Sequence, residues 1–301
     1  MRFGLVGTGP WAHIAHGPGL LAAPAVELVG VWGRSLEKAQ PLARELGVTA
    51  YADYAALLDE VDAVAFAVPP DIQATLALQA ARAGKHLLLD KPIATSVEAA
   101  HALAAAVREH QVGSVVFFTD RFFADSRAWW AEVQRTGGWK GGWMRWFGAL
   151  QTPGNPFGDS PWRHERGALW DTGPHALSNL ITALGPVTTL QATAGEGDLV
   201  MLNLGHESGA SSSITLTQFA PPAAEVVETT VWGDSGFSTM PPRPESAADL
   251  LAIAAGELIA AVESGQPHEV GVEFGARIVE LIAEAQSQIS SQLSSQLSSR
   301  R

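Results

Sequence analysis

The stretch RFGLVGTGPWAHIAHGPGLL, residues 2–21, decides the fold expected of this chain. Its first five residues are mostly apolar and strand-forming, the run stops at Gly7 and Gly9, and apolar residues then return at helical spacing. Glycine at such a break allows a tight turn and a close approach of the backbone to another group, because it has no side chain. The stretch therefore predicts a strand, a glycine turn and a helix.

The same alternation of short apolar runs and longer amphipathic segments continues through the first 120 residues. We expect strands at 2–6, 26–32, 63–68, 86–89 and 114–119, and helices at 11–21, 36–46, 71–83 and 97–110. Strands and helices that alternate at this spacing form a parallel sheet with helices on both faces. We therefore predict an α/β protein whose residues 1–120 form a Rossmann-type, doubly wound domain that binds ligands at the carboxyl ends of its strands.

Length, charge and composition exclude several classes of protein. The 301 residues suffice for two domains with ordinary cores. The formal net charge is -12 and the basic residues are scattered, which argues against a nucleic-acid or anionic-membrane surface. Cysteine is absent, so disulfides and thiolate metal sites are excluded, and no apolar run approaches the roughly 20 residues that span a bilayer. We expect a soluble, cytoplasmic protein without a metal site.

The segment GTGPWA, residues 7–12, has the features of a dinucleotide-binding turn. Gly7 permits the turn, Gly9 lets backbone N–H groups approach a pyrophosphate, and Ala12 is small where helix and strand meet. A helix that begins near Pro10 directs its positive end at the phosphates. Glycine turns also follow strands in other proteins, so the motif depends on its place in the strand and helix pattern. The predicted contacts are Gly7, Thr8, Gly9, Pro10 and Trp11.

The segment ELVGVWGRSLEKAQ, residues 27–40, predicts which dinucleotide is bound. Sites that prefer NAD usually place an acidic side chain at the end of the second strand, where it accepts hydrogen bonds from the ribose 2′-hydroxyl. Gly33 stands there instead, and Arg34 follows with planar donors that suit a 2′-phosphate. Ser35 and Lys38 add a hydroxyl and a second cation. We predict NADP, with NAD as the alternative if Arg34 and Lys38 are simply solvated residues.

The segment AGKHLLLDKPIA, residues 83–94, predicts a buried strand that ends at Asp90, Lys91 and Pro92. These residues lie at the same sheet edge as the glycine turn. Pro92 restricts Lys91 to extended geometry, which fixes the direction of the lysine. An Asp-Lys pair that leaves a strand is also typical of an ordinary solvated turn.

The segment RGALWDTGPHALSNLITALG, residues 166–185, predicts a helix capped by Thr172. Asp171 and His175 are four residues apart and straddle the helix start, so both can point toward one spot. The helix amino terminus disfavours a charged imidazole and the carboxylate favours it, which leaves a histidine able to exchange protons near neutrality. The alternative interpretation is a capping aspartate and a structural histidine.

Together these stretches resemble the Gfo/Idh/MocA family of oxidoreductases, the glucose-fructose oxidoreductase and inositol dehydrogenase group, from residue 2 to about residue 285. AGKHLLLDKPIA stands in the place of the family's A-G-K-H-V-x-x-E-K-P and WDTGPHALSNL in the place of its D-x-G-x-H, with support from DRFF and PWRHERGAL. The resemblance implies that Lys91, Asp171 and His175 form the catalytic group, and that Trp162 and Arg163 lie near the nicotinamide. It implies hydride transfer between NAD(P) and a sugar, cyclitol or related polyol.

Three departures from the family pattern bear on the site. Asp90 replaces the usual glutamate, which keeps the charge and shortens the reach. VPPDIQ follows the fourth strand where the family often has Asn and His, and Ser178 replaces a common acidic residue, which weakens the substrate assignment. The remaining predicted cofactor contacts are Val68, Pro69, Pro70, Gln73, Asp90 and Lys91. A non-catalytic dinucleotide and sugar sensor is the alternative function, whereas a nucleophilic hydrolase lacks the G-x-S-x-G motif.

The rest of the chain predicts an α+β domain over residues 121–286. Its expected strands, 142–150, 190–194, 199–204, 211–218 and 225–232, form an open, mainly antiparallel sheet, followed by helices at 246–264 and 274–286. In the family such a sheet often forms a subunit interface, so we expect a homodimer or homotetramer.

The final segment SQISSQLSSQLSSRR, residues 287–301, has Ile289, Leu293 and Leu297 at every fourth position. One apolar residue per turn is too narrow a stripe for a stable free helix. We therefore expect a disordered or partner-dependent tail whose removal after Gln286 changes the melting temperature little.

Overall fold

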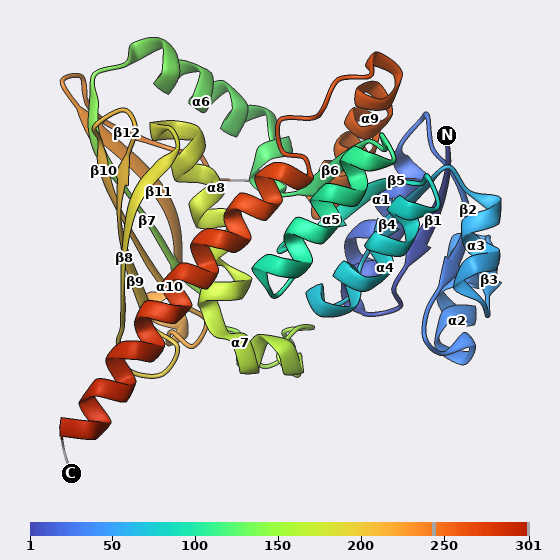
Figure 1. Ribbon diagram of the computed structural model, residues 1–301, viewed down its shortest axis with the longest axis horizontal. Helices are drawn as coiled ribbons and strands as arrows, with labels where there is room; N and C mark the ends of the chain where they lie inside the picture. The colour runs from blue at the N-terminus through green and yellow to red at the C-terminus, as the bar shows by residue number, and fades with distance from the viewer. Residues whose placement is uncertain (243–244, 300–301) are drawn as a thin grey trace. The chain divides into compact units, whose positions relative to one another are not determined.

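The computed structural model describes residues 1–242 and 245–299, which fall into two compact units (Figure 1). Of these residues, unit 1 contains 1–122 and 245–279, and unit 2 contains 123–242 and 280–299. The sequence pattern predicts one continuous second domain over 121–286, whereas in the structure residues 245–279 belong to unit 1. No helix among the described residues is both long and apolar enough to cross a membrane.

Unit 1 contains a six-stranded parallel sheet in the order β3-β2-β1-β4-β5-β6, which confirms the predicted Rossmann-type architecture. The strand order reverses direction between β1 and β4, which is where doubly wound sheets bind ligands. The strands are β1 (Arg2–Val6), β2 (Glu27–Trp32), β3 (Thr49–Tyr51), β4 (Ala63–Phe66), β5 (His86–Asp90) and β6 (Ser114–Phe117).

The helices of unit 1 cover both faces of this sheet. Right-handed crossovers place the helices that follow β1 and β2 on one face and those that follow β4 and β5 on the other. Helix α9 packs against α1, β5 and β6, which explains why residues 245–279 belong to this unit. The helices are η1, a π-helix (Ala12–His16), α1 (Gly17–Ala22), α2 (Leu36–Leu46), α3 (Tyr54–Glu60), α4 (Pro70–Arg82), α5 (Val97–Glu109), η2 (Thr119–Phe122), α9 (Ala247–Ser264) and the start of α10 (Val272–Ser299).

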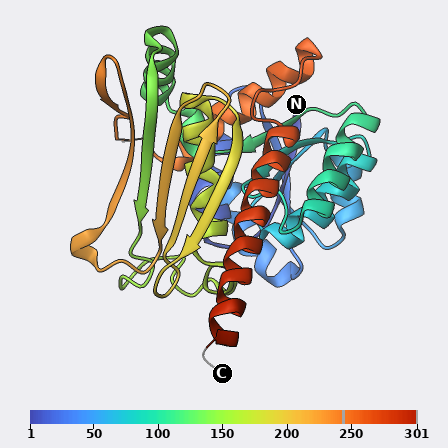
Figure 2. The ribbon, with the colours of Figure 1, turned by 60° about the vertical axis from the view of Figure 1, so that its left-hand side comes forward.

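Unit 2 contains the predicted open sheet, in the order β12-β11-β7-β10-β9-β8. β7 and β10 are parallel and the other neighbours are antiparallel. Helix α8 packs on one face of this sheet, against β7, β10 and β11 (Figure 2). Side chains on the opposite face are exposed. The elements are α6 (Ala124–Thr136), β7 (Trp139–Phe147), α7 (Pro161–Asp171), α8 (Gly173–Leu184), β8 (Val187–Ala194), β9 (Val200–His206), β10 (Ser211–Thr217), η3 (Pro222–Ala224), β11 (Val226–Gly233) and β12 (Gly236–Thr239).

The expectation of disorder is wrong for residues 287–299, because helix α10 continues to Ser299. The amide of Gln288 bonds to the backbone of the edge strand β8: its Oε1 accepts from the N–H of Ala192 at 2.9 Å and its Nε2 donates to Leu190 O at 3.0 Å. Gln292 Nε2 donates to Ala192 O at 2.8 Å. Gln288 and Gln292 thus form hydrogen bonds with backbone groups at the edge of β8. The spacing of apolar residues in the sequence does not indicate such contacts. The side chains of Leu293 and Leu297, and residues 300–301, lie outside the described part.

We expect Gln288→Ala to lower the free energy of unfolding by about 1–3 kcal/mol, because the buried Ala192 N–H loses its partner. Chemical denaturation of the full chain measures this change. Gln286→Ala is the matched control, since that amide contacts Ser290 within the same helix, and we expect a change of less than about 0.5 kcal/mol. Equal stability of the two variants would show that the edge contact contributes nothing.

Candidate active site

The predicted cofactor residues of unit 1 lie in four loops at the carboxyl edge of its sheet, after β1, β2, β4 and β5. Gly7 joins three of these strands. Its N–H donates to Trp32 O at 2.9 Å, and its φ of +132° is a conformation that other residues rarely adopt. A Cβ at this position would lie 2.3 Å from Ala67 O, so the packing of the sheet itself requires glycine here.

Gly9 is different, because the surrounding protein does not require a glycine there. Apart from Gly9 and its neighbours in the chain, no atom of the described residues lies within 4 Å of the position that a Cβ on Gly9 would take. Gly9 O accepts hydrogen bonds from the N–H groups of Ala12 and His13, which starts the helical segment. The open space next to this backbone fits a ligand that must lie close to it, as the pyrophosphate of a dinucleotide does.

The loop after β2 presents cations and no carboxylate. Gly33 is buried, and a Cβ on it would lie 2.7 Å from the Cγ2 of Thr8. The methyl group of Thr8 therefore occupies the space that an acidic side chain at this position would enter. Arg34 and Lys38 are exposed, and Ser35 caps helix α2 by accepting from the N–H of Lys38 at 3.4 Å.

Gln73 holds the Lys91 turn from helix α4. Its side chain is fully buried, its Nε2 donates to Asp90 O at 2.7 Å and to Pro92 O at 3.2 Å, and its Oε1 accepts from the Asp90 N–H at 2.8 Å. The peptide between Lys91 and Pro92 is cis. Gln73 was predicted as a cofactor contact; in the structure its amide is occupied by this turn. Pro70 is the first residue of α4, where a missing N–H costs nothing.

In unit 2, Asp171 is buried at the end of α7 and is held by two donors. Its Oδ2 accepts from Arg163 Nε at 3.0 Å and from Gln218 Nε2 through a short hydrogen bond. The Arg163 guanidinium lies 4.7 Å from the ring centroids of both Phe157 and Trp162. The structure thus places Trp162 and Arg163 beside Asp171, and their proximity to a nicotinamide stays a prediction.

His175 is buried in the first turn of α8, four residues after Asp171. Its ring stacks on Trp146 of β7, with centroids 5.3 Å apart and an interplanar angle of 29°. Thr172 is the N-cap residue of this helix, as predicted, but its hydroxyl donates to Ala168 O at 2.9 Å and forms no capping hydrogen bond. The chain passes directly from α7 into α8, which orders both site residues without a capping hydrogen bond.

Asp198 and Gln218 are site-supporting residues that the sequence did not indicate. Asp198 accepts hydrogen bonds from the Thr217 hydroxyl at 2.6 Å, the Gln218 N–H at 2.9 Å and the Ala168 N–H at 3.2 Å. It thereby ties the end of β10 to helix α7. Gln218, 47 residues from Asp171 in the chain, then reaches that carboxylate. Neither residue lies in a motif, so only the tertiary structure identifies them.

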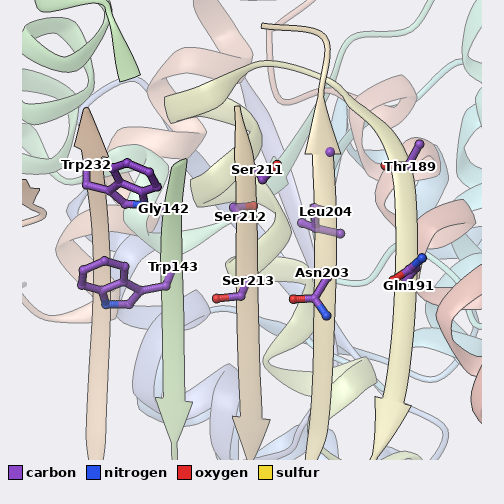
Figure 3. Close-up of a pocket in the computed structure, with 11 residues that line it drawn as sticks. Gly142, Trp143, Thr189, Gln191, Asn203, Leu204, Ser211, Ser212, Ser213 and Trp232 are labelled. Carbon is purple, nitrogen blue, oxygen red and sulfur yellow. The ribbon is translucent and has the colours of Figure 1, made fainter. Parts of the chain in front are cut away.

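A shallow hollow of about 480 Å³ lies on the open face of the unit 2 sheet, opposite the face that contacts α8 (Figure 3). The indoles of Trp143 and Trp232 line one side and the amides of Gln191 and Asn203 the other. Trp143 Nε1 donates to Glu228 at 2.7 Å, and this bond is the main cause that lowers the pKa of Glu228. Asp171, Arg163, His175 and Gln218 are not among the residues that line the hollow, so it is separate from the group around Asp171.

The sheet order and the glycine turn define a dinucleotide-binding protein of the Rossmann class with a second, α+β unit. The family model described as an oxidoreductase family with an NAD-binding Rossmann fold matches residues 1–118. Residues 1–118 thus match the NAD-binding domain of the Gfo/Idh/MocA oxidoreductases, the family that the sequence motifs resemble.

Known relatives extend the comparison. A UDP-N-acetylglucosamine 3-dehydrogenase of Acidithiobacillus ferrooxidans is 34% identical over 37% of this chain and 35% of its own length. A dTDP-3,4-didehydro-2,6-dideoxy-alpha-D-glucose 3-reductase of Streptomyces antibioticus is 30% identical over 62% of this chain and 57% of its own length. The chain thus spans about a third and just over half of these two relatives.

Among solved structures, a levoglucosan dehydrogenase in complex with NADH and levoglucosan is similar over 97% of both chains, with a TM-score of 0.85 and 19% identity. At this identity the likeness shows that the two proteins share a fold, including the second unit that the family model does not cover.

Proposed function

We propose that this chain is an NAD(P)-dependent oxidoreductase that transfers hydride between the nicotinamide and a hydroxyl-bearing or carbonyl carbon of a sugar, cyclitol or related polyol. The observation that carries the proposal is the open backbone at Gly9, placed where the strand order reverses. The ordered pair of Asp171 and His175 supports it, as do the relatives named as sugar dehydrogenases and reductases.

The bound nicotinamide would supply the hydride donor or acceptor, with residues 7–11 holding the pyrophosphate and residues 33–38 the adenosine ribose. In our proposal His175 takes or gives the hydroxyl proton, and the Lys91 ammonium stabilises the negative charge that develops on the substrate oxygen. Asp171 orients His175. Because Arg163 and Gln218 hold one carboxylate oxygen of Asp171, its geometry is set before substrate binds.

We expect Lys91→Ala and His175→Ala to lower turnover by about 100-fold or more, as for other proton-transfer and charge-stabilising groups. Both variants should fold and bind cofactor. The measurement is NAD(P)H absorbance with a panel of sugars, cyclitols and polyols, after a thermal-shift screen has identified ligands that stabilise the wild type.

Two exposed residues provide matched controls for these substitutions. Lys140→Ala removes a lysine that pairs with Asp234 on the surface of unit 2, and His110→Ala removes a histidine at the end of α5. Both should keep wild-type turnover. Near-normal turnover by either site variant would refute the mechanism. If the wild type binds cofactor but turns over no compound of the panel, the alternative function of a non-catalytic sensor would be favoured.

We propose further that the cofactor is NADP(H) in preference to NAD(H). Gly33 carries no carboxylate to repel a 2′-phosphate, and the Thr8 methyl group lies 2.7 Å from where a Cβ at this position would be. Exposed Arg34 and Lys38 supply cationic donors for that phosphate.

Arg34→Ala should weaken NADPH binding by about tenfold, equivalent to about 1.4 kcal/mol, and leave NADH binding within about twofold. Dissociation constants measured by fluorescence titration test this selectivity. Arg44→Ala, an exposed arginine in the last turn of α2, is the control and should change neither constant. Tighter binding of NADH than NADPH by the wild type would contradict the preference.

We propose that the enzyme acts in the cytoplasm as a homodimer or homotetramer, with the open face of the unit 2 sheet buried between copies. This face carries Phe237 at 74%, Trp232 at 41% and Met201 at 39% exposure. The Phe237 ring lies 5.9 Å from that of Trp143. Large exposed side chains grouped in this way are typical of an interaction surface.

Phe237→Glu should shift the oligomer toward the monomer, because the carboxylate would be buried in the proposed interface. Light scattering coupled to size exclusion measures the mass across a range of protein concentrations. Ile253→Glu on α9, where the wild-type side chain is 42% exposed, is the control and should leave the mass unchanged. A monomeric wild type, or an unchanged mass for Phe237→Glu, would contradict the proposal that this face is buried between copies.

A further inference from the structure

His16 is a fully buried histidine at the end of the π-helix η1. A π-turn contains one residue more than an α-turn, and such turns are frequent at functional sites. The edges of the His16 ring meet the rings of Trp11 and Phe117, with centroid distances of 6.4 and 6.1 Å. The side chain of His13, on the same segment, is 39% exposed and pairs with Glu45, so burial distinguishes the two histidines.

The polar contact of His16 is the side chain of Asp90. Nε2 of His16 lies 3.4 Å from Asp90 Oδ2, and the Asp90 side chain is 14% exposed. Among the described residues neither ring nitrogen of His16 reaches hydrogen-bond geometry. A buried polar group left in this state calls for an explanation, and its contact with the Asp90 carboxylate offers one.

The other oxygen of Asp90 completes a path to Lys91. Oδ1 accepts from the backbone N–H of Lys91 at 2.7 Å. One carboxylate thus connects a buried imidazole with the peptide from which Lys91 leaves the sheet. Gln73 holds the backbone on either side of this peptide, so His16 supplies a second restraint that acts on the side chain of Asp90.

Building on the proposed function, we propose that His16 is a positioning residue for Lys91. Its Nε2 lies against the Asp90 carboxylate and restricts its position, Asp90 accepts from the Lys91 amide, and the lysine therefore leaves the sheet in one direction. His16 does not touch substrate in this proposal. If His16 were only an apolar filler between Trp11 and Phe117, a phenylalanine would serve as well.

The test compares His16→Phe, which keeps a ring and removes the N–H, with His16→Gln, which keeps an N–H donor. Hydrogen exchange of the Lys91 amide, followed by NMR in the full chain without substrate, is the first readout. We expect exchange about tenfold faster in His16→Phe and close to wild type in His16→Gln, because exchange reports how often the hydrogen bond of that amide opens. His13→Phe is the matched control and should exchange like the wild type.

The second readout is turnover. In His16→Phe, kcat should fall about tenfold while KM and the cofactor dissociation constant stay within about threefold, since an interaction specific to the transition state is weakened. His16→Gln should restore most of kcat. Wild-type amide exchange in His16→Phe, or equal losses in both variants, would overturn the proposal.

The exchange measurement needs no substrate, so it is independent of the proposed reaction, which Lys91→Ala tests separately. If His16→Phe does not fold, Asp90→Ala takes its place in the exchange experiment. The Lys91 amide must then exchange faster in Asp90→Ala and stay protected in His16→Gln. A protected Lys91 amide in Asp90→Ala would equally overturn the proposal.

Discussion

The contact between Gly7 and the carbonyl of Ala67 is the constraint on which unit 1 depends. The end of β1 packs so closely against the end of β4 that a Cβ on Gly7 would lie 2.3 Å from Ala67 O. The Gly7 N–H also donates to Trp32 O at the end of β2. Three strands therefore end together at the position where the strand order reverses. The loops that follow these strands lie at one edge of the sheet, so a ligand bound next to Gly9 would lie close to all of them.

The sequence predicted this unit well because its information is local. Alternating strands and helices and the glycine turn all lie within a few residues of the element that they define. The sequence did not predict β3 and α3, which span three and seven residues and are too short for a periodic pattern. The π-helix was also not predicted, since its extra residue has no signature in apolar spacing.

The supporting contacts of unit 2 could not be predicted, because they join residues far apart in the chain. The motif around Asp171 and His175 indicated a reactive pair, but the carboxylate is held by Gln218, and Gln218 is placed by Asp198. The tail shows the same limit. Its narrow apolar stripe predicted disorder, whereas Gln288 stabilises it by bonding to the edge of β8.

The Lys91 turn, the Asp171 carboxylate and the tail are each held by a glutamine, and the chemistry of the amide explains why. An amide donates and accepts at once and carries no charge, so it can hold a backbone or a carboxylate without adding a competing ion. Gln73 holds the Lys91 turn in this way, and Gln218 holds Asp171. An arginine or aspartate in place of Gln73 would bury a further charge at this turn, which is costly unless the charge is paired. At both places the amide orders its partner without adding an ion of its own, and at Asp171 it works beside the charged guanidinium of Arg163.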